Sequence, residues 1–130
     1  MAGIYVHIPF CKQSCYYCDF HFSTSLKTVE RVIHSIKKEI ALQKNYLSNQ
    51  KIETIYFGGG TPSLLESGLI HGILQEIYRT FNISTEIELT IEANPEDITI
   101  AKINEWLRMG INRVSIGIQS FRNQDLLYMN

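Results

Sequence analysis

Residues 5–18 read YVHIPFCKQSCYYC and place an alternating strand directly before three closely spaced cysteines. Apolar and polar side chains alternate over residues 3–8, which predicts a strand with one buried and one polar face. All three cysteines of the chain, Cys11, Cys15 and Cys18, fall in the loop that follows. An odd number of cysteines so close together indicates a metal site or a reactive thiol rather than a disulfide framework.

Strands and helices alternate outward from this loop. Further strands are predicted at residues 53–57, 86–93 and 113–119, and amphipathic helices at residues 25–46, 70–81 and 99–109, with another helix beginning near residue 126. This alternation predicts right-handed crossovers and a parallel sheet, so the expected fold class is α/β.

The predicted strands alternate in polarity, whereas fully buried parallel strands usually read as continuous apolar runs. In the third strand, for example, Leu89 and Ile91 flank Thr90 and point away from it. We therefore expect one face of the sheet to pack under the helices and the polar face to line a ligand chamber.

About four strand–helix units are visible, and the last has barely begun. Eight-unit barrels typically take about 250 residues. Residues 1–130 are therefore interpreted as a partial (β/α) barrel, the truncated N-terminal part of a longer core domain, with no internal linker or second domain.

The charge and the distribution of apolar residues argue against several classes of function. The formal net charge is −1 and no basic stripe is present, so a nucleic-acid partner is not expected. No apolar stretch reaches the roughly 18 residues of a membrane helix. The first ten residues lack the basic region and cleavage site of a signal peptide, so a cytoplasmic location is expected.

Three thiolates at these spacings can hold one face of a four-iron cluster and leave the fourth iron open for chemistry. The alternative is a structural zinc site completed by His7, Asp19 or His21. Structural zinc sites usually pair their ligands in two separated knuckles, and no second Cys/His pair lies downstream.

Three further polar features each follow or finish a predicted strand. They are the turn Gly58-Gly59-Gly60-Thr61-Pro62, Glu92 with Ala93-Asn94-Pro95 after it, and Gln119. Each alone has an ordinary structural explanation, but ligands of βα barrels bind at the carboxyl ends of the strands. We therefore expect these features and the cysteines to surround one site.

Together, these motifs resemble the HemN/HemW branch of the radical S-adenosylmethionine (SAM) proteins over essentially the whole chain. The resemblance implies that the cysteines bind a [4Fe–4S] cluster whose open iron binds SAM. It also implies SAM contacts, in which Tyr5 and Tyr17 touch SAM or shield the cluster, Gly59, Gly60 and Thr61 hold its methionine part, and Glu92 and Gln119 hold its ribose or amino-acid end.

Two functions are known in that branch: oxygen-independent coproporphyrinogen III oxidase (dehydrogenase) and haem chaperone. The enzymes carry a further cysteine two residues after the third, where this chain has Phe20, and an N-terminal extension, whereas this chain begins four residues before Tyr5. Both differences favour a HemW-like haem chaperone, and whether it runs radical chemistry stays open. The implied partners are SAM, haem or a porphyrinogen, an electron donor and a haem-acceptor protein.

Overall fold

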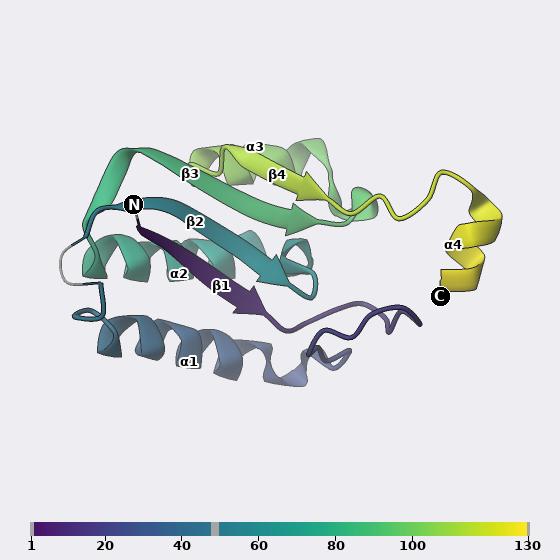
Figure 1. Ribbon diagram of the computed structural model, residues 1–130, viewed down its shortest axis with the longest axis horizontal. Helices are drawn as coiled ribbons and strands as arrows, with labels where there is room; N and C mark the ends of the chain where they lie inside the picture. The colour runs from purple at the N-terminus through teal and green to yellow at the C-terminus, as the bar shows by residue number, and fades with distance from the viewer. Residues whose placement is uncertain (1, 48–49, 130) are drawn as a thin grey trace.

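The computed structural model describes residues 2–47 and 50–129, which fold around one four-stranded sheet (Figure 1). The strands are β1 (Ala2–Ile8), β2 (Ile52–Gly59), β3 (Ile83–Ala93) and β4 (Arg113–Ile116). They run parallel in the order β1-β2-β3-β4. The prediction of a parallel α/β sheet is confirmed, and the sheet is a partial barrel with β1 and β4 at its open edges.

Among the described residues, three α-helices and three short 3₁₀ turns connect the strands, and a fourth helix follows β4. The helices are α1 (Val29–Leu42), α2 (Ser67–Thr80), α3 (Ile100–Arg108) and α4 (Asn123–Met129), and the turns are η1 (Leu26–Thr28), η2 (Pro62–Leu64) and η3 (Pro95–Asp97). Helices α1, α2 and α3 lie on the same face of the sheet (Figure 1). None of the described helices is both long and apolar enough to cross a membrane.

The core lies between this helical layer and the apolar face of the sheet. Ile55 and Phe57 of β2 and Leu89 of β3 are fully buried in the same core cluster as Ile73 and Ile77 of α2. The alternation predicted for the strands is present: Val6 is 4% exposed, whereas Tyr5 is 58% exposed. Burial of the apolar face therefore orients the polar face toward the opposite side of the sheet.

The apolar side chains of β4 and of the segment after it are not buried, although they alternate with polar ones as in the other strands. Val114, Ile116 and Ile118 remain 38–52% exposed, so the expectation that they pack under helices is wrong for the described residues. Helix α4 does not cover them because it lies near the cysteine loop, where the Tyr16 N–H donates to the Met129 carbonyl over 3.1 Å (Figure 1).

Several predicted boundaries shift by a few residues. The predicted helix at residues 25–46 contains the turn η1 followed by the shorter α1, and β3 begins three residues early at Ile83. Strand β4 pairs with β3 only as far as Ile116 opposite Ala93, and the Gly117 N–H then donates to the Ala93 carbonyl over 3.1 Å. Gln119 therefore lies beyond the strand rather than at its end.

Candidate cofactor site at the carboxyl edge of the sheet

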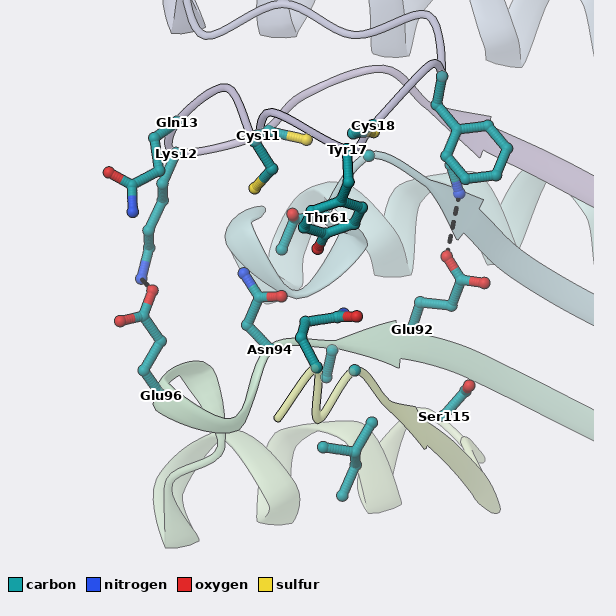
Figure 2. Close-up of a pocket in the computed structure, with 18 of the residues that line it drawn as sticks. Cys11, Lys12, Gln13, Tyr17, Cys18, Thr61, Glu92, Asn94, Glu96 and Ser115 are labelled. Carbon is teal, nitrogen blue, oxygen red and sulfur yellow. Dashed lines mark hydrogen bonds and ion pairs between the residues drawn. The ribbon is translucent and has the colours of Figure 1, made fainter. Parts of the chain in front are cut away.

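A cavity of about 570 Å³ lies along the carboxyl ends of the four strands (Figure 2). It is lined by the cysteine loop (residues 9–23), by the glycine turn (residues 58–62), by the segment after β3 and by residues at and after β4. Nine of the ten predicted site residues line it: Cys11, Cys15, Tyr17, Cys18, Gly59, Gly60, Thr61, Glu92 and Gln119. The structure thus brings together residues that are more than 100 positions apart in the chain.

Tyr5 is the predicted residue that does not line this cavity. Its ring lies against Tyr56, with 6.0 Å between ring centroids, and its hydroxyl lies 3.0 Å from Nδ1 of His7. Nε2 of His7 lies 3.2 Å from the carbonyl oxygen of His21, which can only accept. His7 must therefore carry its proton on Nε2, and Nδ1 accepts from Tyr5. Both ring nitrogens are engaged, so His7 is not poised as a metal ligand.

The three cysteines are free thiols and each is partly buried. The Cys11 N–H donates to the Ser23 carbonyl over 3.1 Å, and the Cys18 N–H donates to the Cys15 carbonyl over 3.1 Å. Among residues 2–47 and 50–129, no three His, Cys, Asp or Glu side chains converge closely enough to hold a metal ion as they stand. A four-iron cluster does not need such convergence, because each of the three thiolates would bind a different iron.

Burial raises the pKa of Cys11, and the nearby Cys18 and Cys15 raise it further, while the Thr61 hydroxyl opposes this shift. Burial and the neighbouring Cys15 likewise raise the pKa of Tyr17. Since a thiolate is the metal-binding form, Cys11 must give up a proton when it becomes a ligand.

The glycine turn approaches the cysteine loop very closely. A Cβ atom on Gly60 would lie 2.5 Å from the Phe10 carbonyl oxygen and 2.9 Å from the Cys11 sulfur. The Thr61 N–H donates to the same Phe10 carbonyl over 2.7 Å. The turn therefore supports the first cysteine directly, and the close approach leaves no room for a side chain at position 60.

Glu92 is held from strand β2 on both of its oxygens. The Tyr56 hydroxyl donates to Oε1 over 2.7 Å, and the Gly59 N–H donates to Oε2 over 3.1 Å. A Cβ on Gly58 would lie within 3.2 Å of the side chains of Tyr5, Tyr56 and Glu92. These three side chains can therefore converge only because residue 58 has no side chain.

Tyr56 is a functional candidate that the sequence analysis missed. The alternation of polarity could have indicated it, because Tyr56 flanks the fully buried Phe57 and must face the polar side of the sheet. The hydrogen bond to Glu92 raises the pKa of Tyr56, with burial adding to the effect. Its hydroxyl therefore keeps its proton and remains a donor to the carboxylate.

Gln119 reaches the cavity from the segment after β4. A Cβ on Gly117 would lie 2.9 Å from Nε2 of Gln119, so the amide folds back over a residue without a side chain. Figure 2 shows Cys11, Cys18 and Tyr17 along one side of the cavity and Glu92 and Ser115 on another. The arrangement places three soft sulfur donors beside carboxylate, amide and backbone polar groups.

Comparison with known proteins identifies relatives along the whole chain. The model of the "Radical SAM superfamily" matches residues 5–129. A protein named "Heme chaperone HemW" from Buchnera aphidicola subsp. Schizaphis graminum is 39% identical, with 96% of this chain and 34% of the relative covered. The protein of that name from Escherichia coli (strain K12) is 35% identical, with 95% of this chain and 33% of the relative covered. The one from Bacillus subtilis (strain 168) is 33% identical, with 98% of this chain and 34% of the relative covered. The chain therefore spans about a third of the length of the curated relatives it matches.

A solved structure shares the fold closely. Coproporphyrinogen III oxidase (HemN) from Escherichia coli, described as a radical SAM enzyme, superimposes with a TM-score of 0.91 at 25% identity, over 98% of this chain and 30% of that protein. Elp3 from the archaeon Methanocaldococcus infernus superimposes with a TM-score of 0.56 at 16% identity over 96% of this chain and 30% of its own, which supports the fold alone.

Proposed function

Because the chain belongs to the radical SAM superfamily, we propose that Cys11, Cys15 and Cys18 hold a [4Fe–4S] cluster and that the cavity beside them binds SAM. The observation that carries this proposal is the position of three free thiols on the same sheet edge as the glycine turn, Glu92 and Gln119. Three sulfur donors suit a cluster with one open iron. When bound, the cluster and SAM supply one-electron cleavage chemistry at the SAM sulfonium.

The residues of the chain bind and orient SAM in this proposal. The backbone of Gly59 and Gly60 and the side chain of Thr61 contact its methionine part. Glu92, already held by Tyr56 and Gly59, accepts hydrogen bonds from its ribose or ammonium group with the remaining lone pairs. Gln119 contacts the ribose or amino-acid end. Tyr17 covers the cluster, and Tyr5 supports it through His7 rather than from the cavity wall.

We propose that the protein to which this chain contributes is a haem chaperone of the HemW type, which binds haem and passes it to an acceptor protein. Support comes from relatives of that name at 33–39% identity, and from Phe20 in place of the additional cysteine of the enzymes. Residues 1–130 would form the first part of its radical SAM core. The free thiols favour a reducing compartment such as the cytoplasm.

Oxygen-independent coproporphyrinogen III oxidase is the second candidate, favoured by the TM-score of 0.91 with that enzyme. The two candidates differ in what they do with a tetrapyrrole. The enzyme decarboxylates two propionates of coproporphyrinogen, with SAM as oxidant and an electron donor, whereas the chaperone binds haem and leaves it unchanged.

The deciding experiment compares haem binding with coproporphyrinogen III decarboxylation in the intact, anaerobically reconstituted protein. A chaperone retains haem on gel filtration and produces no protoporphyrinogen, and turnover to protoporphyrinogen would overturn the chaperone assignment. The absorption spectrum tests the cofactor separately. A broad band near ~400 nm that dithionite bleaches indicates a thiolate-bound cluster, whereas stoichiometric zinc with no such band contradicts it.

A further inference from the structure

Asp97 is a buried carboxylate that has no part in the proposed SAM contacts. It ends the turn η3 after β3, and its side chain is 7% exposed. A carboxylate is rarely buried without a cation and hydrogen-bond donors, because removing its charge from water is costly. The groups that contact Asp97 therefore show which segments of the chain this carboxylate holds together.

The cation that contacts Asp97 comes from the cysteine loop. Nζ of Lys12, the residue after the first cysteine, lies 2.6 Å from Oδ1 of Asp97 and 2.9 Å from Oε1 of Glu96. Figure 2 shows the Lys12 side chain descending from the loop to Glu96 at one end of the cavity. Both ion pairs that the loop makes among the described residues come from Lys12.

The other oxygen of Asp97 connects to the turn η2, which follows the glycine turn. Oδ2 accepts from the Ser63 hydroxyl over 2.7 Å, and that hydroxyl accepts from the Asn94 N–H over 3.2 Å. Lys102 of α3 donates to the Ser63 carbonyl. One buried carboxylate thus joins the cysteine loop, the turn after β2 and the turn after β3, which are the three segments that would surround the cluster and SAM.

We propose that Lys12 and Asp97 are positioning residues, whose ion pair holds the cysteine loop against the η3 turn before any cluster binds. Binding a cluster would fix the cysteine loop in one conformation, at a cost in conformational entropy. A loop already tethered next to Cys11 has less conformational entropy to lose in that step. The consequence for cluster uptake rests on the proposed function, whereas the tether itself does not.

Asp97 and Glu96 provide a matched pair of variants for the test. Both carboxylates contact Lys12, but the side chain of Glu96 is 65% exposed and that of Asp97 is 7% exposed. Asp97→Asn and Glu96→Gln remove the same charge at neighbouring positions. The Lys12 side chain is itself 42% exposed, but an ion pair with a buried carboxylate is more costly to break than one with an exposed carboxylate. Lys12→Met tests the other partner, with Lys38→Met on α1 as its control.

The measurement is amide hydrogen exchange of the intact, metal-free protein, followed over residues 11–18. We expect at least about tenfold faster exchange in Asp97→Asn and Lys12→Met, and less than about twofold change in Glu96→Gln and Lys38→Met. Exchange in β2 and α2 reports whether each variant still folds. If Asp97→Asn unfolds, the comparison of Lys12→Met with Lys38→Met decides whether the ion pair holds the cysteine loop.

Wild-type exchange rates in the loop of Lys12→Met, or equal effects of Asp97→Asn and Glu96→Gln in folded protein, would overturn the proposal. Iron and sulfide uptake gives a second readout, in which Lys12→Arg, which keeps the charge, should recover more than Lys12→Met. If the wild-type protein takes up no cluster, the proposed function fails, and the exchange measurement on metal-free protein still decides whether the tether exists.

Discussion

The hydroxyl of Tyr56 lies 2.7 Å from Oε1 of Glu92, a contact between neighbouring strands 36 positions apart in the chain. The pairing places Tyr56 opposite Thr90 on β3, so Glu92 lies one step further along the same polar face. The carboxylate is thus oriented by a phenol that itself stands outside the cavity lining.

Replacing Tyr56 with Phe should weaken SAM binding without unfolding the protein. The change removes one donor from Glu92, and hydrogen bonds to charged groups contribute about 1.5–3 kcal/mol, which predicts roughly a tenfold or greater loss of affinity. Isothermal titration of the cluster-loaded protein with SAM measures it. Tyr78→Phe on the exposed side of α2 is the control, and unchanged affinity in Tyr56→Phe would show that Glu92 needs no such support.

Replacing Gly60 with Ala should prevent assembly of the cluster. The new methyl would lie 2.5 Å from the Phe10 carbonyl oxygen and 2.9 Å from the Cys11 sulfur, so the cysteine loop must move. Iron and sulfide content after anaerobic reconstitution should fall to a small fraction of wild type. The control is Gly68→Ala at the start of α2, where a Cβ meets no atom within 4 Å and the change should be neutral or slightly stabilising.

Replacing Cys15 with Ala should abolish the cluster because two thiolates cannot hold a cubane that needs three protein ligands. Iron and sulfide analysis and the loss of the absorption near ~400 nm measure this outcome. Ser14→Ala, on the adjacent exposed residue, should load normally. A Cys15→Ala protein that kept its full iron and sulfide would show that the ligand set is wrong.

Asp97 should stabilise the protein at neutral pH and lose that effect in acid. Burial alone raises the pKa of Asp97, but hydrogen bonds from Lys12 and Ser63 and the charges of Lys12 and Lys102 outweigh it and lower the pKa below its usual value. A carboxyl group whose pKa is lowered by folding stabilises the native state above its unfolded pKa of about 3.9, and this contribution is lost as the pH falls through the folded pKa.

Urea denaturation of wild-type and Asp97→Asn protein at a series of pH values tests this. The two stabilities should differ at pH 7 and approach one another below about pH 4, where the carboxyl group begins to take up a proton. The charged groups facing Asp97 in this comparison are Lys12, Glu96 and Lys102. A difference that stayed constant down to pH 2 would contradict an ionised Asp97 as its source.

The predicted strands and helices followed from local patterns, and their errors have a common physical cause. Alternation of polarity predicted which face of β1 and β3 is buried, because a helical layer covers that face. The same pattern on β4 misled, since Val114 and Ile116 have no described element to cover them. The length of β4 also depended on the end of β3, which is a property of pairing rather than of residues 113–119.

The sequence by itself was sufficient to predict the fold class, from the alternation of strands and helices. It also predicted that the cysteine loop, the glycine turn and the polar residues after consecutive strands lie together, because parallel strands bring their carboxyl ends to one edge. Only the tertiary structure could identify Tyr56 as the partner of Glu92 and Lys12 as the partner of Asp97. Both pairs join residues on different strands or loops, and their contacts depend on strand register and on burial. The sequence likewise could not show that both ring nitrogens of His7 are hydrogen-bonded rather than free to bind a metal. The groups that contact them come near His7 only when the chain folds.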